Sequence, residues 1–322
     1  MLQLLKNINV DWLAYRRTFI IISVVIMLGG LGSAVVRYVA PGGTDAFNLG
    51  VDFKGGTVIT AKFKNRPSAE DIRSKLSQAG VNEAIIQPVT DKTDEVLIKL
   101  PLFGEGVAEG QAASEAQNQA QVDIGRTKVR DALKNFGPEV EARESFAAEG
   151  NSFKIVGTDA VGAVAGSALR NQAIAVTLLA LVGILMYIGF RFEWTYGAAA
   201  VIAVFHDVLV TLAFFSIFQW EVSLTVIAAL LTLVGFSVND TIVIFDRIRE
   251  NLRLQRRDSL YKITNDAVNQ TLSRTFITSG LVFLSVLAMV FFGGEVLRGF
   301  SLALTIGIIF GTYSTIGIAS PI

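Results

Sequence analysis

The sequence contains no cysteine, one histidine and few charged side chains for its 322 residues. The absence of cysteine excludes disulfide bonds, thiolate metal sites and a cysteine nucleophile. Charged residues make up 17% of the chain and apolar residues 52%, whereas about 25% of the residues in soluble domains are charged. This deficit indicates a chain that is partly solvated by lipid. The 28 basic residues balance the 28 acidic ones, so the net charge indicates no nucleic-acid partner.

Proline is absent from every long apolar segment of the chain. Six such segments are long enough to cross about 30 Å of hydrocarbon as helices. They are Thr18–Val39, Asn171–Gly189, Tyr196–Phe218, Leu224–Phe245, Phe276–Phe292 and Gly299–Ile318. The first is longer than a signal-peptide core and lacks a small-residue cleavage site. We therefore predict a retained membrane anchor at 18–39, preceded by a short leader at 1–17.

The distribution of lysine and arginine predicts the orientation of these spans. The stretch 246–274 holds seven basic residues and four acidic ones, and the leader is also basic. Because basic loops stay on the cytoplasmic side, both termini and the loop 246–274 are expected in the cytoplasm. The segment 40–170 is then periplasmic or external. We expect a multi-pass protein of the cytoplasmic (inner) membrane whose residues 171–322 form a five-helix bundle.

Helical and strand patterns alternate in the polar segment 40–170. Ser68 is a predicted helix cap, Gly80 a helix stop, and the stretch Phe103–Gln119 has the composition of a partly disordered segment. The order βαββαβ predicts a small ferredoxin-like α+β domain. Its expected strands and helices are Val51–Phe63, Ser68–Gln78, Ala84–Thr90, Glu95–Leu100, Ser114–Phe136, Glu141–Phe146 and Phe153–Val156. No glycine-rich loop here has the spacing of a nucleotide-binding motif, so we expect no bound ATP.

Two ionisable groups lie near the middle of the third span. His206 is the only histidine, and Asp207 follows it. A charged residue near the bilayer centre costs about 2.5–3.5 kcal/mol on insertion scales, so such residues are rare and usually functional. The pair is a candidate for proton or conformational coupling. Alternatively, Asp207 is a buried, hydrogen-bonded packing residue. Neighbouring helix positions point about 100° apart, so the sequence does not require the two side chains to touch.

The fourth span contains a second polar site, with Asn239 beside Asp240. Arg274 begins the next, antiparallel span and lies at a similar depth. We predict an ion pair between Asp240 and Arg274 that a proton would break, which would make it a two-state element. The alternative is that Arg274 extends to the lipid headgroups while Asp240 solvates a helix end.

Three further motifs lie at predicted membrane surfaces. The run from Asp246 to Glu250 continues the fourth helix and is either a solvated face with local ion pairs or a partner-binding face. Arg191-Phe192-Glu193-Trp194 forms a turn with the charge and aromatic character of an interfacial belt. Gly294-Glu295-Val296-Leu297-Arg298 forms the outer turn between the last two spans.

These motifs occur in the order and at the spacing of the SecF family. Its members are the smaller membrane subunits of bacterial SecD–SecF protein-export complexes, a branch of the resistance-nodulation-division superfamily. The chain resembles this family over nearly its whole length. Besides the residues within the spans, the resemblance rests on Gly50, Asp52, Gly55, Gly56, Arg191, Glu193, Asp246, Arg247, Glu250, Gly294, Glu295 and Arg298.

The resemblance implies an accessory subunit of the Sec protein translocase. Such a subunit works with SecD and uses the proton motive force to promote protein translocation across, and release from, the cytoplasmic membrane. The partners it implies are SecD as a heterodimer, the SecY–SecE–SecG channel, YajC, the YidC insertase and the translocating preprotein, all at the lipid bilayer. It assigns proton-linked conformational change to Asp240 and Arg274. Asn239, His206 and Asp207 are further candidates from their position within the spans rather than from the resemblance. It implies no enzyme, no catalytic or metal site, no cofactor and no nucleic acid.

Two other classes of function are weighed against this expectation. A homo-oligomeric, proton-coupled exporter of small molecules or lipids would need two external domains per chain, and the sequence predicts one. A membrane-embedded hydrolase would need a nucleophile paired with a base, but the chain has no HExxH motif and only one histidine, His206. Both therefore rank below the translocase subunit.

Overall fold

The computed structural model describes residues 9–40, 45–81, 84–89, 92–100, 115–141, 146, 151–161, 163–191 and 194–322. The chain forms two compact units. The membrane unit consists of Met1–Asn48, Ala175–Phe291 and Arg298–Ile322. The polar unit consists of Leu49–Ile174 together with Phe292–Leu297.

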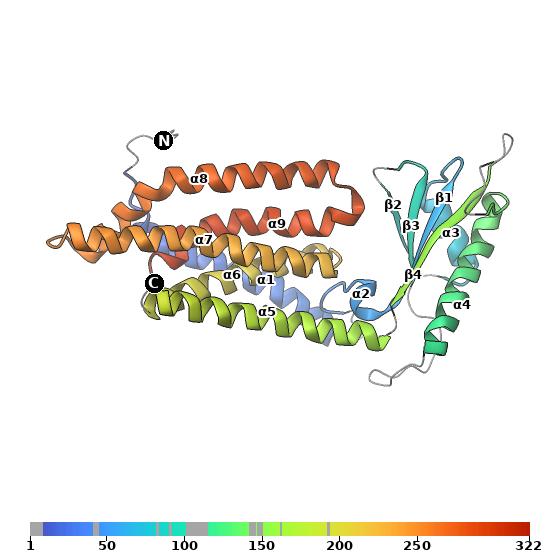
Figure 1. Cartoon of the computed structure of the whole chain (residues 1–322), viewed down its shortest axis with the longest axis horizontal. Helices are drawn as coiled ribbons and strands as arrows, with labels where there is room; N and C mark the ends of the chain where they lie inside the picture. The colour runs from blue at the N-terminus through green and yellow to red at the C-terminus, as the bar shows by residue number, and fades with distance from the viewer. Residues whose placement is uncertain are drawn as a thin grey trace. The chain divides into compact units, whose positions relative to one another are not determined.

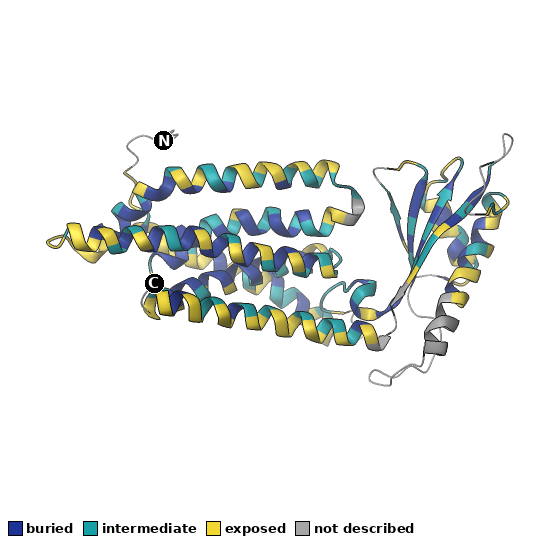
Figure 2. Cartoon of the chain, viewed as in Figure 1, coloured by how far each residue is buried: buried dark blue, intermediate teal, exposed yellow. Residues whose placement is uncertain are grey.

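In the described part of the chain, six helices are long and apolar enough to cross a membrane, which confirms the predicted number. They are α1 (Arg16–Val39), α5 (Ala163–Arg191), α6 (Trp194–Phe218), α7 (Leu224–Leu254), α8 (Leu260–Phe292) and α9 (Gly294–Ser314) (Figure 1). Within the most apolar stretch of each, 56% of the residues of α6 are buried but only 17% of those of α8 (Figure 2). By the same measure the last span, Leu297–Ala319, is 61% buried, so the bundle is built around α6 and α9, while α8 keeps a wide exposed face.

The stretch 246–274, expected as a cytoplasmic loop, is almost entirely helical. Helix α7 continues to Leu254 and α8 begins at Leu260, so the connection is short. Charged side chains three or four residues apart pair along these extensions, as Arg249 does with Asp246 at 3.1 Å and Lys262 with Asp258 at 3.1 Å. Such pairs stabilise helix surfaces that have left the apolar part of the span. The predicted continuation of the fourth helix through Glu250 is confirmed, but the expectation of a loop over the rest of the stretch was wrong, because the end of an apolar run is not the end of a helix.

Helix α1 packs tightly against α6 because small residues face each other. A Cβ atom placed on Gly30 would lie 2.2 Å from the Cβ of Ala213, so only glycine fits there. Near the end of α1, the hydroxyls of Ser33 and Ser216 are 3.0 Å apart and Arg37 donates to the carbonyl oxygen of Ser216. Close backbone approach with hydrogen bonds across it is the way helices associate in lipid. The N-terminal span is thereby an integral part of the bundle.

Two asparagines on α8 hold the segment that precedes α1. Asn265 accepts from the backbone N–H of Trp12 at 2.9 Å, and Asn269 accepts from the Trp12 indole Nε1 at 3.1 Å. Both amide groups donate to the carbonyl oxygen of Val10, at 3.0 and 2.9 Å. A side-chain amide offers both a donor and an acceptor, so the pair satisfies backbone groups much as a neighbouring strand would. The N-terminal segment is thus tied to α8.

The polar unit has the predicted ferredoxin-like topology. Its four strands are β1 (Gly56–Phe63), β2 (Ile85–Pro88), β3 (Glu95–Leu100) and β4 (Phe153–Val161). They form an antiparallel sheet in the order β2-β3-β1-β4. Helices α3 (Ala69–Gln78) and α4 (Glu115–Leu133) contact each other and the sheet. The largest fully buried side chains of its core include Ile59, Phe63, Ile72, Leu76, Ile98, Leu100, Leu133 and Phe153.

The predicted strand Val51–Phe63 is wrong in its first half. Val51–Lys54 forms a short helix, α2, and β1 begins only at Gly56. Gly55 has φ 79° and Gly56 has φ 151°, values that glycine adopts without a steric penalty. A Cβ on Gly56 would also lie 2.4 Å from the carbonyl oxygen of Leu100. The two glycines therefore form the break between helix and strand.

The predicted helix boundaries in the polar unit are confirmed. The backbone N–H of Asp71 donates to Ser68 Oγ at 3.1 Å, and Gly80 follows α3 with φ 79°. Helix α4 continues as the 3-10 turn η2 (Lys134–Phe136) up to Gly137. Of the predicted strand Glu141–Phe146, residues 142–145 lie outside the described residues, as do 103–114 of the low-complexity stretch.

One exposed ion pair in the polar unit predicts how its stability depends on pH. Lys62 Nζ lies 2.9 Å from Asp94 Oδ2. The hydrogen bond from Lys62 lowers the pKa of Asp94, and the same bond raises the pKa of Lys62. The stabilisation is therefore present at neutral pH. It is lost in acid as pH falls through the lowered pKa of Asp94, and in alkali as pH rises through the raised pKa of Lys62.

Replacing Asp94 with Asn is accordingly expected to destabilise the polar unit slightly at neutral pH and low salt. Both side chains are about one-third exposed, so solvent and salt weaken the pair. Amide hydrogen exchange of β1 and β3 measures the difference between the variant and the wild-type chain. That difference should shrink in acid and at high salt. A difference that neither condition changes would contradict the ion-pair explanation.

Candidate functional site

A buried polar cluster joins α6, α7 and α9 inside the membrane unit. Asp207 on α6 is fully buried and His206 is 5% exposed. His206 Nδ1 lies 2.9 Å from Asp207 Oδ1, so the two neighbouring side chains do touch. Ser237 Oγ on α7 donates to Asp207 Oδ2 at 2.6 Å. The absence of a side chain at Gly311 on α9 leaves room for that carboxylate, because a Cβ there would lie 3.5 Å from Oδ2. Both oxygens of Asp207 are thus hydrogen-bonded.

A layer of hydroxyl groups extends this cluster toward the C-terminal end of the chain. Thr241 donates to the carbonyl oxygen of Ser237 at 3.0 Å, and its hydroxyl lies 3.2 Å from that of Thr315. Thr315 begins a π-helix, η3 (Thr315–Ala319), directly after α9. Such π-turns are rare and often occur at functional sites. Sequence analysis did not single out Ser314 or Thr315. The sequence feature that could have indicated them is the run of consecutive hydroxyl residues, 312–315, within an apolar span.

Asp240 lies one turn beyond Ser237 on α7 and is directed toward α8. It is 4% exposed, and Ser279 Oγ donates to its Oδ2 at 2.9 Å. Helix α7 ends at Leu254 and α8 begins at Leu260. The number of residues from Asp240 to Leu254 equals the number from Leu260 to Arg274. The two residues therefore lie at equal depth, roughly 20 Å along each helix from the turn.

The predicted direct ion pair between Asp240 and Arg274 is nevertheless not formed. Among the described residues, no ion pair within 4.0 Å joins them, and the guanidinium attracts the carboxylate only at longer range. Thr275 and Ser279, four residues apart, occupy the buried face of α8, while Arg274 is exposed. One residue along a helix is a rotation of about 100°, so Arg274 points away from the face that Ser279 directs to Asp240.

Asn239 is separated from the cluster although it neighbours Asp240 in sequence. It lies on the exposed side of α7, in line with Thr232 and Gly235, which are also exposed. These three residues form a polar, small-residue stripe on the outward face of the helix, hereafter the outer stripe of α7. The structure thus brings Asp207 and Asp240 to the buried side of α7 and leaves Asn239 on the other side.

The charged run at the end of α7 does more than present a solvated face. Arg247 pairs with Glu250 and donates through Nε to Gln270 Oε1 on α8 at 2.6 Å. Asn251 also donates to Gln270 Oε1, at 3.1 Å. Asp246 is exposed and pairs within its own helix. This run therefore fastens α7 to α8 near the turn that connects them.

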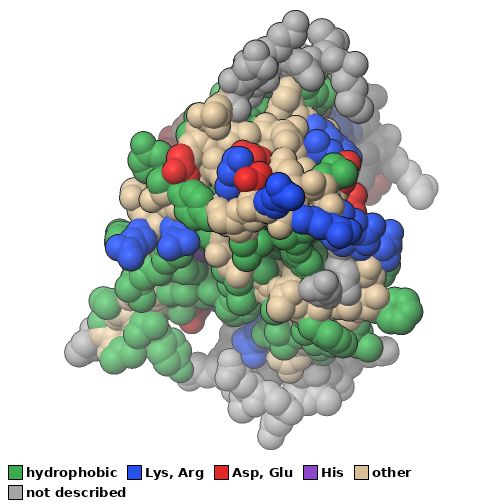
Figure 3. All heavy atoms as spheres, turned by 90° about the vertical axis from the view of Figure 1, so that its left-hand side faces the viewer, with side chains coloured by type: hydrophobic (Ala, Val, Ile, Leu, Met, Phe, Trp, Pro, Cys, Tyr) green, Lys and Arg blue, Asp and Glu red, His purple; other side chains and the backbone are tan. Residues whose placement is uncertain are grey.

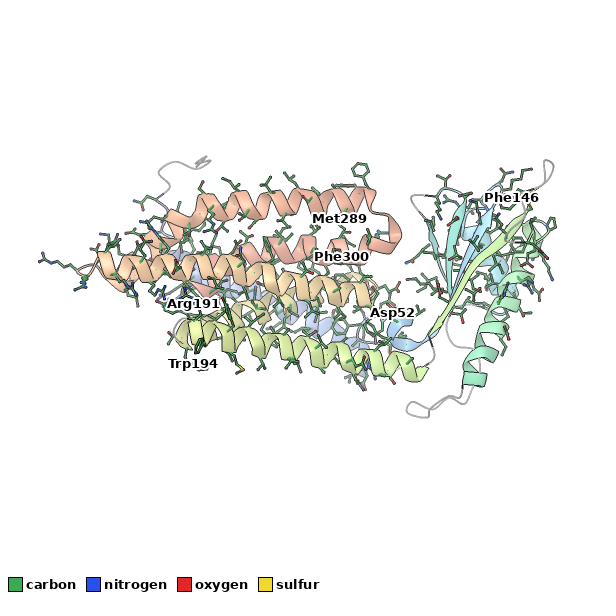
Figure 4. The ribbon with its side chains drawn as sticks, viewed as in Figure 1. Asp52, Phe146, Arg191, Trp194, Met289 and Phe300 are labelled. Atoms are coloured by element: carbon green, nitrogen blue, oxygen red, sulfur yellow. The ribbon has the colours of Figure 1, made fainter. Side chains whose placement is uncertain are left out.

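The remaining predicted motif residues lie in several places. Asp52 is on α2 of the polar unit, next to the Gly55–Gly56 break. In the membrane unit, Arg191 ends α5 and Trp194 begins α6 (Figure 4). A Cβ on Gly189 would lie 2.7 Å from the Trp194 ring, so the indole packs on that glycine. Glu193 lies outside the described residues, as does the side chain of Glu295. Gly294, with φ 71°, starts α9, and Arg298 lies on the exposed surface of that helix.

The end of the bundle that carries the start of α1 and the α7–α8 connection is basic (Figure 3). Its exposed cations include Arg16, Arg17, Arg253, Arg256, Arg257 and Lys262. A cavity of about 410 Å³ opens there, lined among others by Leu13, Tyr196, Phe245, Tyr261 and Ile322. Among the residues that the structure describes, no group of three or more histidine, aspartate or glutamate side chains could hold a metal ion.

Fold and site together define a class: a multi-pass membrane protein with one inserted ferredoxin-like domain and buried carboxylates within its helix bundle. Residues 141–322 match the family described as protein export membrane protein SecD/SecF, C-terminal, and residues 43–65 match the SecD/SecF GG motif. The protein translocase subunit SecF of Koribacter versatilis is 39% identical, over 99% of this chain and 92% of that protein. The chain belongs to the SecF branch of the SecD/SecF family.

Solved structures show the same relationship. The crystal structure of SecDF, a translocon-associated membrane protein from Thermus thermophilus, matches with a TM-score of 0.73 and 32% identity. A second structure, of SecDF in a super-membrane-facing form, matches with a TM-score of 0.64 and 33% identity. Each alignment covers 98% of this chain and 38% of the SecDF chain. The chain therefore corresponds to well under half of SecDF.

Proposed function

We propose that the chain is an accessory subunit of the Sec protein translocase. It works with SecD and uses the proton motive force to promote protein translocation across, and release from, the cytoplasmic membrane. The observation that carries this proposal is Asp240, a carboxylate 4% exposed between two spans of a translocase-subunit fold. One charge crossing 100 mV releases about 2.3 kcal/mol, so a few protons could drive the movement of a domain.

Asp240 and its neighbours support a simple two-state element. While ionised, Asp240 accepts from Ser279 and attracts Arg274 at a distance. Protonation removes that attraction and weakens the charge-assisted hydrogen bond from Ser279. Helices α7 and α8 stay fastened at the Arg247–Gln270 contact. In this proposal the Arg247–Gln270 contact acts as a pivot, and the two helices separate at the level of Asp240. The polar unit responds to that movement.

The outer stripe of α7 supports SecD as an obligate partner. Thr232, Gly235 and Asn239 are exposed in the middle of a span. The Thr232 hydroxyl donates to the Ala228 carbonyl oxygen of its own helix at 2.8 Å, but lipid offers the Asn239 amide no hydrogen bonds. Small and polar residues in a span are typical of helix–helix contacts. We propose that SecD covers this stripe. The SecY–SecE–SecG channel, YajC, YidC and the preprotein are further proposed partners.

Replacing Gly235 with Leu is therefore expected to weaken the association with SecD. Among the residues that the structure describes, no atom lies within 4 Å of a Cβ at Gly235, so we expect the larger side chain to disturb a partner rather than the bundle. A loss of about 1.4 kcal/mol of binding free energy between the chain and SecD would reduce the SecD recovered at limiting concentration about tenfold. Gly183 on α5 is equally open, which makes Gly183→Leu the matched control. Equal recovery of SecD with both variants would remove the stripe from the interface.

The basic end of the bundle supports a location with both termini in the cytoplasm and the polar unit periplasmic or external. The function itself is tested by precursor export into inverted membrane vesicles that lack or contain the chain together with SecD. Vesicles containing both should export more when energised, and an uncoupler should abolish the gain at constant ATP. A gain that persists in the uncoupler would contradict the use of the proton gradient. A chain that assembles only with itself would favour a homo-oligomeric exporter.

A further inference from the structure

His206 has one ring nitrogen that the proposed mechanism at Asp240 does not use. Its Nδ1 lies against Asp207 Oδ1, while its Nε2 is buried and has no hydrogen-bond partner among the described residues. The ring faces Tyr313 of α9, with 6.5 Å between the ring centroids and an interplanar angle of 30°. Tyr313 in turn hydrogen-bonds to the backbone of α1 at Phe19. The open nitrogen therefore lies on the α9 side of α6, where a bound water or proton would complete its hydrogen bonding.

The charges around this pair favour the binding of one proton. Apart from His206 and Asp207, helix α6 carries no Asp, Glu, Lys or Arg, and its one other titratable group is Tyr196 near its start; α1 carries no charge between Arg17 and Arg37. The nearest charged residue along α7 is Asp240, which adds negative charge, and α9 has none after Arg298. Arg274 of α8 is exposed. A neutral His206 beside an ionised Asp207 is thus a buried net negative charge, and one added proton makes the pair neutral.

We propose that His206 and Asp207 form a second proton-binding site, separate from Asp240, whose proton enters through His206 Nε2. A hydronium ion gives its proton to the Nε2 lone pair and leaves as water. The Nδ1 proton then passes to Asp207 Oδ1, leaving a neutral imidazole beside a neutral carboxylic acid. The proton binds to the pair as a whole. This inference rests on the proposed function, because it supplies a second site for the same gradient.

The site reaches Asp240 through α7. Ser237 Oγ donates to Asp207 Oδ2, and Asp240 lies one turn further along the same helix. A hydrogen bond to a carboxylate is stronger than one to a neutral acid, so proton binding at Asp207 loosens the contact between α6 and α7. Both carboxylates therefore act on α7. Asp207 controls its contact with α6, and Asp240 controls its contact with α8.

Infrared spectroscopy of the chain in complex with SecD tests the proposal without measuring transport. In an Asp240→Asn background, acidification should produce a protonated-carboxyl band that shifts in D₂O and is absent when Asp207→Asn is added. The His206→Asn variant keeps an amide donor near Asp207 Oδ1 and loses Nε2. Proton uptake after a pH jump should then slow roughly 100-fold, the lower range for loss of a positioned acid–base group.

Each other result contradicts the proposal. A spectrum in which Asp207→Asn changes no titrating band shows that Asp207 is only a packing residue. A band that depends on Asp207 but forms at the wild-type rate in His206→Asn excludes entry through Nε2. The Asp207→Asn single variant, compared with the wild-type complex, should lack the same band, so the test holds even if the double variant fails to assemble. Failure of gradient-dependent export would leave these spectra unchanged, so the two proposals fail separately.

Discussion

Replacing Asp240 with Asn is expected to abolish the dependence of protein export on the proton gradient while the complex with SecD stays assembled. Asparagine has nearly the same shape and its oxygen can still accept from Ser279, as Asp240 Oδ2 does at 2.9 Å. It cannot ionise, so the attraction to Arg274 is always absent. If one coupled charge is lost at 100 mV, the driving force falls by about 2.3 kcal/mol, or about 50-fold.

Precursor export into energised vesicles measures this effect as the part that an uncoupler removes. Asp258→Asn is the matched control, because Asp258 is an exposed acid at the α7–α8 connection that pairs with Lys262 at 3.1 Å. Arg274→Met should reproduce the defect of Asp240→Asn. Ser279→Ala should cause a smaller one, since it removes a hydrogen bond and no charge. Wild-type dependence on the gradient in both Asp240→Asn and Arg274→Met would show that the coupling site lies elsewhere.

The six spans and the topology of the polar unit could be predicted because both depend on patterns that are local in sequence. Apolar length decides whether a helix spans lipid, and the order of helices and strands restricts the sheet to few topologies. The short helix α2 could not be predicted in this way. Val51–Lys54 is compatible with a strand, and only the positive φ values of Gly55 and Gly56 end one element and begin the other.

Depth along the membrane could likewise be predicted by counting residues, which placed Asp240 and Arg274 at the same level. The direction of each side chain could not, because it depends on how α8 is rotated against α7. Thr275, one residue after Arg274, shares the buried face of α8 with Ser279, so the contact of Asp240 is Ser279 rather than Arg274. The contact of Asn265 and Asn269 with the N-terminal segment joins residues more than 250 positions apart. No local pattern contains such information.

Replacing Gly30 with Leu is expected to prevent the membrane unit from assembling. Even a Cβ at this position would lie 2.2 Å from the Ala213 Cβ and 2.5 Å from its Cα. Neither the Cβ nor the Cα of an alanine can move by a change of rotamer, so α1 must move away from α6. That movement also breaks the contacts of Ser33 and Arg37 with Ser216. Overpacking alone typically costs about 1–3 kcal/mol, and the lost hydrogen bonds add to it.

The thermal unfolding midpoint in detergent, together with the amount of chain that accumulates in membranes, measures this prediction. Gly29→Leu is the matched control, because no atom lies within 4 Å of a Cβ at Gly29 on the same helix. Gly30→Ala should be intermediate, and adding Ala213→Gly should restore part of its stability because the 2.2 Å clash is with the Ala213 side chain. Equal effects of leucine at positions 29 and 30 would mean that α1 does not pack on α6 through this face. The N-terminal span would then be an anchor only, whereas a selective loss at Gly30 makes it part of the bundle that surrounds His206 and Asp207.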